Sequence, residues 1–236
     1  GDWKTGRGVA IIMQKSGIPD IDQANCMVKL ESDGTFIVHS GGADIGTGLD
    51  TVVKKLTAEV LCCCPDDIHV ISGDTDHALF DKGAYASSGT CFSGNAAKMA
   101  AENLRKKILF HGAAQIGEPV EDVTLAAPGV VRGKKGEITF GDLAHAAEGG
   151  TGFGVLVANA SYITPDFAFP YGANFAEVAV NTRTGEIRLD KFYALLDCGT
   201  PVNPDLALGQ IYGASMRAIG HSMSEEIRYD AKGVPL

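Results

Sequence analysis

Two glycine-rich loops carry the residues whose types and spacing could support chemistry. The first spans residues 41–48 and the second spans residues 83–94, about forty residues further along the chain. Each loop follows an apolar, strand-like run and precedes a helical pattern, so its backbone N–H groups can point toward a ligand and favour an anion such as a phosphate. Ser87, Ser88 and Thr90 add hydroxyl groups to the second loop. The pair predicts a large phosphorylated cofactor that is held from two sides.

Neither loop matches a common nucleotide-binding motif. The glycine spacing of residues 41–48 differs from the dinucleotide fingerprint, and no Gly-Lys-Ser/Thr follows it as a P-loop requires. Taken alone, either loop could be a structural turn, and the hydroxyl groups of the second loop could cap the next helix instead of binding a ligand. An enzyme that binds a nucleotide phosphate on an unrelated fold therefore remains an alternative.

Two further groups of residues could bind metal. Asp74, Asp76, His77 and Asp81 form a cluster of carboxylates and imidazole, for which a solvated loop with Asx-turns is favoured over a metal or catalytic site. The six cysteines contain no Cys-x-x-Cys pair, and three of them are consecutive at residues 62–64. Adjacent residues cannot easily all face one metal, so reduced thiols are expected, with no zinc or iron–sulfur site and no residue of this chain bound directly to a metal.

The composition limits the possible partners. The chain has 236 residues and 45% hydrophobic content, enough for a sizeable core, and its net charge of −9 argues against nucleic acid or an anionic membrane surface. No apolar run approaches the roughly 18–20 residues that span a bilayer. We therefore expect no membrane partner and a cytoplasmic location. The chain begins at Gly1 rather than Met, so both ends are expected to be cut from something longer.

Hydrophobic periodicity and turn residues predict an α+β fold. In the first half the pattern predicts strands at 8–15, 25–31, 35–40 and 68–71 and helices at 49–61 and 93–111. In the second half it predicts short strands at 123–125, 130–131 and 138–139, a helix that opens near 140, a hairpin of 173–180 with 187–196, and a helix of 203–222. Ser93 and Asn203 are the expected N-caps of their helices. Because hairpins and helices interleave, we expect mixed sheets with packed helices rather than a parallel dinucleotide-binding sheet.

Three segments in this order resemble one known family. They are residues 41–49, residues 83–88, and residues 197–213, which contain Asp-Cys-Gly, Val-Asn-Pro and Gly-Gln-Ile-Tyr-Gly. Together they resemble the molybdenum-binding region of the xanthine dehydrogenase/oxidase family, and the bacterial xanthine dehydrogenase or hypoxanthine oxidase type is the most similar. The resemblance covers about residues 6–232. It implies that residues 1–236 are most of one molybdopterin-binding domain, with subdomains 1–112 and 113–236 as an option.

The resemblance implies a role for each loop. The first loop would contact the molybdopterin cofactor near its phosphate end and dithiolene, the second would pass under the molybdenum centre and the pterin, and a glutamine of the third segment would contact the pterin. The residues at the matching positions are Ile45, Gly46, Thr47 and Gly48, then Tyr85, Ala86, Ser87 and Ser88, and finally Gln210.

The chain departs from the family pattern in two places. Thr47 stands where the family usually has glutamine, and its shorter hydroxyl cannot reach as far as an amide. The family's general base is a glutamate in a downstream Gly-Glu motif, which is expected beyond Leu236. The chain is therefore expected to contain no catalytic residue and, alone, to be inactive and to bind cofactor poorly.

The parent protein implied by the resemblance oxidises a purine or related N-heterocycle with water as the oxygen source. Iron–sulfur clusters are expected in another domain or subunit, whether FAD is also present stays open, and the rest of the molybdopterin-binding region is the expected partner. The alternative is a non-catalytic module that holds cofactor or forms an interface in a split or degenerate hydroxylase. A Gly-Glu motif in the parent reading frame would distinguish the two.

Overall fold

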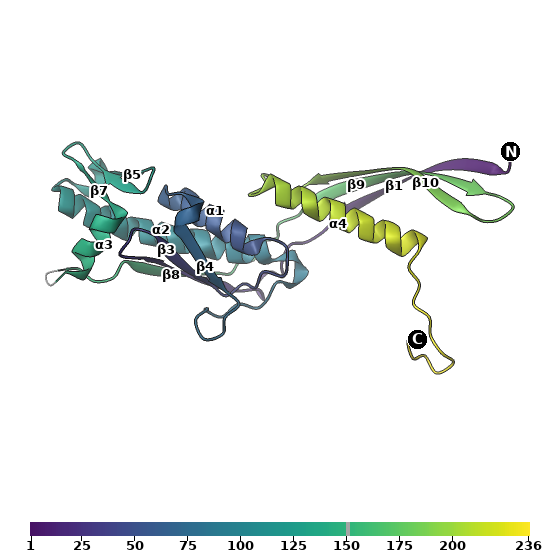
Figure 1. The fold of residues 1–236 in the computed structure, drawn as a ribbon, viewed down its shortest axis with the longest axis horizontal. Coiled ribbons are helices and arrows are strands. Elements are labelled where there is room, and N and C mark those ends of the chain that lie inside the picture. The colour runs from purple at the N-terminus through teal and green to yellow at the C-terminus, as the bar shows by residue number, and fades with distance from the viewer. Residues whose placement is uncertain (150–151) are drawn as a thin grey trace. The chain divides into compact units, whose positions relative to one another are not determined.

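The chain divides into two compact units in a computed structural model that describes residues 1–149 and 152–236. Unit 1 joins residues 1–14 to residues 169–236, and unit 2 spans residues 15–168. The helix α2 (Gly89–Ile116) lies within unit 2 and runs without a break through residue 112. Each unit mixes strands and helices, which confirms the predicted α+β class (Figure 1).

Unit 2 is built on a four-stranded sheet in the order β4-β3-β2-β8. The strands are β2 (Ala24–Leu30), β3 (Phe36–Ser40), β4 (Ile68–Ser72) and β8 (Val157–Tyr162). The hairpin of β2 and β3 is antiparallel, as the sequence predicts, and β4 joins β3 in parallel. A parallel neighbour needs a crossover, and the helix α1 (Leu49–Leu61) provides it.

The core of unit 2 lies between this sheet and two helices. Alternate residues of β2 are buried while those between them are half-buried, so one face of the strand is apolar. The long helix α2 packs against β2, β8 and α1 (Figure 1). Small residues on α2, such as Ala97 and Ala100, are fully buried and let the helix approach closely. This core fixes the end of β3 and the start of α1, and the first glycine loop connects these two points.

A smaller group of elements completes unit 2. The antiparallel strands β5 (Thr124–Ala126), β6 (Val130–Arg132) and β7 (Glu137–Thr139) form a meander, and the helix α3 (Phe140–Glu148) follows at once. Within the described residues, short 3-10 turns occur at Pro65–Asp67, Tyr85–Ser87 and Val120–Asp122. The short strands and the helix opening at Phe140 confirm the predictions for this region.

Unit 1 contains a three-stranded antiparallel sheet and one helix. The sheet has the order β1-β9-β10, from β1 (Trp3–Met13), β9 (Tyr171–Asn181) and β10 (Ile187–Asp197). The helix α4 (Pro204–Met223) starts as predicted, because the Asn203 side-chain oxygen accepts the Leu206 N–H at 3.3 Å.

Unit 1 has almost no core of its own. Ala179 is the single buried hydrophobic residue among its described residues, and α4 contains no buried residue. Large apolar side chains are instead exposed along the strands and the helix, among them Ile11, Leu195 and Met216. Burial of apolar surface is the main term that stabilises a fold, so the sheet of unit 1 gains little from the contacts it makes here.

The N-cap of α2 differs from the sequence prediction. The helix begins at Gly89, after Ser88, and Ser93 lies one turn inside it. The Ser93 hydroxyl donates to Asp81 at 3.1 Å instead of capping the helix. A local pattern could not reveal this because Asp81 belongs to the preceding irregular segment. In addition, β1 begins at Trp3, earlier than the predicted strand 8–15.

The cysteines are free thiols in different environments. Cys26 is buried and Cys63 is half-buried, and burial raises the pKa of each thiol to about 12. Cys64 and Cys198 are exposed. Among the described residues no group of three His, Cys, Asp or Glu side chains is placed to hold a metal ion. Within the same residues, no helix is long and apolar enough to cross a membrane.

These environments predict the order of thiol labelling. At about pH 8 we expect Cys64 and Cys198 to react first with a disulfide reagent, and Cys26 and Cys63 to react at least about 100-fold more slowly, because the thiolate is the reactive form. Mass spectrometry after timed labelling measures the order. All six thiols should react in denaturant, and fast labelling of Cys26 in the native chain would contradict its buried position.

Candidate functional site

The first glycine loop connects β3 to α1. Gly41, its first residue, lies so close to the segment after β4 that a Cβ there would be 2.3 Å from the Leu79 carbonyl oxygen. At the other end, Gly48 adopts a left-handed conformation with φ of +83° just before α1. Glycine is therefore required at one end by close approach and favoured at the other by backbone geometry.

The carboxylate of Asp44 occupies the inside of this loop. It accepts the N–H groups of Gly46, Gly48 and Asp50 at 2.9, 3.1 and 3.2 Å. Partial burial of Asp44 disfavours the charged form and raises the pKa of its carboxyl. The hydrogen bonds from the backbone N–H groups have the larger combined effect and hold the pKa below its usual value. The expectation that the loop N–H groups are free for an incoming anion is therefore wrong for Gly46 and Gly48, and the N–H group of Asp50 at the start of α1 is engaged as well.

The rest of the first loop presents side chains to solvent. Ile45 is 68% exposed, and Thr47 is exposed with a hydroxyl in place of an amide. A Cβ built on Gly46 would meet no atom within 4 Å, so the outer surface at this residue is open. The surface that a ligand can reach thus consists of the side chains of Ile45 and Thr47 and the bare backbone at Gly46.

The second loop has a strained backbone. Ala86 and Ser87 both adopt left-handed conformations, with φ of +51° and +56°. For residues with a Cβ this costs about 1–2 kcal/mol each. Such strain persists only where neighbouring contacts hold the chain, and it is concentrated at functional sites. Ser88 is buried, and its hydroxyl donates to the Gly83 carbonyl at 3.1 Å.

The two loops are neighbours in unit 2. Asp81 links them: its carboxylate accepts the Gly83 N–H at 2.7 Å and the Ser93 hydroxyl at 3.1 Å, and it lies against Gly41. A Cβ on Gly42 would in turn lie 2.6 Å from the Ser93 hydroxyl oxygen. The structure therefore brings the start of the first loop, at Gly41 and Gly42, against Asp81 and Ser93 of the second-loop region. That residues 45–48 and residues 85–88 form one site stays a prediction. Sequence reasoning identified Asp81 only as part of an acidic cluster and missed this role.

Gln210, the remaining predicted site residue, belongs to unit 1. It lies on α4 and is exposed, in the second turn after the Asn203 cap. A Cβ built on the adjacent Gly209 would meet no atom within 4 Å, so this part of the helix surface is open. Gln210 can therefore present its amide to a ligand from unit 1.

The acidic cluster that follows β4 is a hydrogen-bonded turn. Asp74 accepts the Asp76 N–H at 2.9 Å and contacts the His77 ring nitrogen at 2.8 Å. These interactions hold the pKa of Asp74 below its usual value. This confirms the favoured interpretation of a loop with an Asx-turn.

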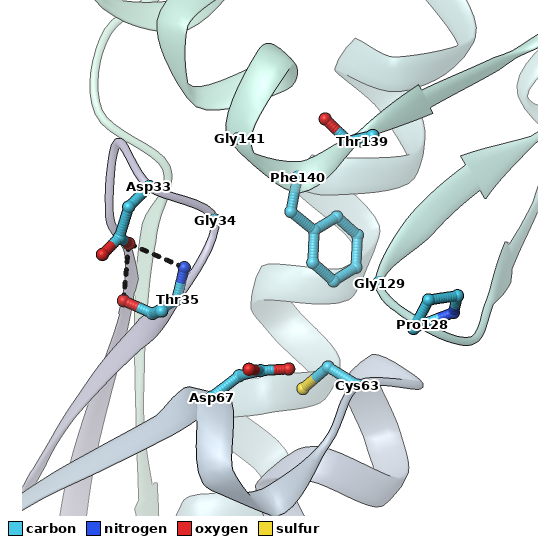
Figure 2. Close-up of a pocket in the computed structure, with 10 residues that line it drawn as sticks. All are labelled: Asp33, Gly34, Thr35, Cys63, Asp67, Pro128, Gly129, Thr139, Phe140 and Gly141. Atoms are coloured by element: carbon cyan, nitrogen blue, oxygen red, sulfur yellow. Dashed lines mark hydrogen bonds between the residues drawn. The ribbon is translucent and has the colours of Figure 1, made fainter.

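A small pocket lies at the other end of β3 and α1 from the glycine loops (Figure 2). Its walls include Asp33, Cys63, Asp67 and Phe140. Asp33 accepts the Thr35 hydroxyl and N–H, so its carboxylate is already engaged. Burial keeps the Cys63 thiol protonated, with a pKa of about 12. Asp33 and Cys63 are therefore not available in this pocket as a free base and a thiolate nucleophile.

Removing the Asp44 carboxylate tests the internal hydrogen bonds of the first loop. We expect Asp44→Ala to lower the free energy of unfolding of unit 2 by about 1 kcal/mol, as for the loss of a helix cap. Because the pKa of Asp44 is depressed, this contribution is present at about pH 5 to 8 and is lost as acid protonates the carboxyl. Urea titrations at several pH values measure it. Asp66→Ala, which removes an exposed carboxylate, is the control, and equal effects of both variants would contradict the assignment.

Comparisons with known proteins cover the whole chain. A family model described as the molybdopterin cofactor-binding domain matches residues 1–236. The protein named "Probable hypoxanthine oxidase XdhD" of Escherichia coli (strain K12) is 86% identical over 236 residues, which are 100% of this chain and 25% of that protein. The "Xanthine dehydrogenase molybdenum-binding subunit" of Escherichia coli O157:H7 is 31% identical over 98% of this chain and 32% of its own length.

Solved structures share the fold. A CO dehydrogenase from Oligotropha carboxidovorans matches with a TM-score of 0.89 at 27% identity, over 100% of this chain and 31% of that chain. Quinoline 2-oxidoreductase from Pseudomonas putida 86 matches with a TM-score of 0.88 at 26% identity, over 100% of this chain and 32% of that chain. The chain thus spans about a quarter to a third of the length of the proteins it matches.

Proposed function

Because the chain belongs to the molybdopterin cofactor-binding domain family, we propose that it is the cofactor-binding part of a molybdenum hydroxylase that oxidises a purine or a related N-heterocycle. The resemblance to the xanthine dehydrogenase family is confirmed by the family match and by the 86% identical relative. The observation that carries the proposal is the junction at Asp81, whose carboxylate binds Gly83 and Ser93 of the second loop while its side chain lies against Gly41 of the first loop.

The chemistry of the two loops suits a polar, phosphorylated cofactor. Both loops present backbone and hydroxyl groups at the surface, and Thr47 and Ser87 are exposed. Internal hydrogen bonds fix the backbone of both loops, so the loops can present these groups to a ligand in a defined geometry. Since the N–H groups of Gly46 and Gly48 already bind Asp44, the Thr47 hydroxyl is the side-chain donor that this loop presents to the proposed cofactor.

The proposed contacts fall into three groups along the chain. The first loop would hold the phosphate end and dithiolene, the second would support the pterin and the metal centre, and α4 would add an amide. The residues are Ile45, Gly46, Thr47 and Gly48, then Tyr85, Ala86, Ser87 and Ser88, and lastly Gln210. None of them is proposed as a metal ligand. Their task is to bind and orient the cofactor.

The cofactor, when bound, supplies the redox chemistry that hydroxylates the ring with oxygen from water. The residues of this chain hold and orient, and we propose that the general base and the groups that select the substrate come from the remaining molybdopterin-binding region. Iron–sulfur clusters, with or without FAD, would belong to another domain or subunit. A cytoplasmic location is part of the same proposal.

Two observations favour a second function, a non-catalytic module that only holds cofactor or forms an interface. Thr47 replaces the usual amide, and Asp44 engages the loop N–H groups that could hold a phosphate. A chain with fewer donors would bind the cofactor less tightly. Activity of the complete protein separates the two functions.

The test uses the complete protein that carries these residues. We expect molybdenum and pterin in equal, stoichiometric amounts and dye reduction that depends on hypoxanthine, because the loops would then hold a working cofactor. The 236-residue chain alone should be inactive. Cofactor without turnover of any purine or related N-heterocycle would support the holding module, and a protein purified without pterin would contradict both functions.

A further inference from the structure

The second glycine loop is tied to a distant, buried carboxylate. The Tyr85 hydroxyl donates to one oxygen of Asp22, 63 residues earlier, and the Ile18 N–H donates to the other oxygen at 2.8 Å. Asp22 is only 2% exposed. We propose that Asp22 is a positioning residue that sets the conformation of the second glycine loop through the Tyr85 hydroxyl. This inference rests on the proposed function, because that loop is proposed to support the cofactor.

The turn that carries Asp22 is itself fixed to the core of unit 2. A Cβ on Gly17 would lie 2.1 Å from the ring of Phe92, so the backbone of this turn is pressed against a buried side chain of α2. Further along, the Asp20 N–H donates to the Thr164 carbonyl at 3.1 Å. Asp22 is therefore a rigid attachment point and not part of a free loop.

The second loop needs such an attachment. Ala86 and Ser87 are held in left-handed conformations that residues with a Cβ rarely adopt. Two contacts with the same turn flank this strain: the Tyr85 hydroxyl binds Asp22, and the Ala86 carbonyl accepts the Gly17 N–H at 2.7 Å. Without the first contact, the strained residues lose one of the interactions that determine their backbone angles.

The tether also defines what Tyr85 offers to a ligand. Its hydroxyl is engaged by Asp22, while the side chain as a whole remains 42% exposed. The hydrogen bond to Asp22 raises the pKa of Tyr85 above its usual value, so the phenol stays protonated and continues to donate. Tyr85 therefore contributes the surface of its ring rather than a hydroxyl group to the proposed cofactor site.

The test compares Tyr85→Phe, Asp22→Asn and the double variant in the complete protein purified with its pterin. Two quantities are measured: amide hydrogen exchange across residues 83–89, and the rate at which bound pterin is released. We expect each single variant to accelerate both by about tenfold, the scale for losing a hydrogen bond to a charged group. Because both changes break the same contact, the double variant should be no faster than the faster single variant.

Tyr162→Phe is the control, since it removes a tyrosine hydroxyl from the same unit and keeps the ring that packs edge-on against Phe92. If Asp22→Asn fails to fold, Tyr85→Phe decides alone, because it keeps the ring and the buried carboxylate. Wild-type release in the Tyr85→Phe variant, or effects that multiply in the double variant, would overturn the positioning role while leaving the proposed function intact. A wild-type protein without pterin would overturn both.

Discussion

Replacing Gly41 with alanine is expected to lower the free energy of unfolding of unit 2 by about 3 kcal/mol, the upper range for forcing extra atoms into a packed site. The new Cβ would lie 2.3 Å from the Leu79 carbonyl oxygen and 2.7 Å from the Asp81 Cβ. The nearest atom belongs to the backbone, so a rotamer change cannot relieve the clash. The segment that carries Asp81 must move, and the two glycine loops must separate.

Urea unfolding of the 236-residue chain measures this loss, and the pterin content of the complete protein measures its effect on the proposed site. Gly136→Ala is a matched control, because a Cβ at Gly136 meets no atom within 4 Å. The control should change stability by no more than about 0.5 kcal/mol. Equal stability of the two variants would mean that Gly41 is not packed as described.

Hydrogen exchange of the isolated chain is expected to differ sharply between the two units. Amides of β2 and α2 in unit 2 should exchange at least about 100-fold more slowly than amides of β9 in unit 1, since local stability follows buried apolar contacts. Unit 2 has a continuous core, whereas unit 1 buries a single hydrophobic residue, Ala179, among those described. Mass spectrometry of peptides after timed exchange measures the exchange rates of the two units separately.

The complete protein provides the comparison for this prediction. If other parts of that protein cover the sheet of unit 1, then β9 should become as well protected there as β2, while protection of unit 2 should change little. Equal protection of β9 and β2 in the isolated chain would show that unit 1 is stable with the small core it has.

Sequence alone predicted the elements whose signals are local. The helix at 49–61 was predicted with its observed bounds, because its apolar residues repeat with helical spacing and Pro65 follows. The hairpin of β2 and β3 and the Asn203 cap were predicted for the same reason: turn and cap residues act on the few residues beside them.

The contacts that shape the candidate site could not be predicted in this way. Tyr85 binds Asp22, which lies 63 residues earlier in the sequence. Ser93 was predicted to cap a helix, but its hydroxyl donates to Asp81 instead. Unit 1 likewise pairs β1, which lies within the first 14 residues, with β9, which begins at residue 171. Such pairings depend on tertiary packing, and no local or periodic sequence pattern reveals them. The family resemblance located the loops, but only the structure shows what holds them.

The carboxylate inside the first loop has a consequence for the order of assembly. Asp44 already accepts hydrogen bonds from the N–H groups of Gly46, Gly48 and Asp50. The loop therefore needs no bound phosphate to adopt its conformation. The entropy of ordering these residues is lost during folding and not during loading. A ligand that binds after folding meets a loop that is already ordered. The free energy of its contacts with the loop is therefore not spent on ordering these residues and contributes to affinity.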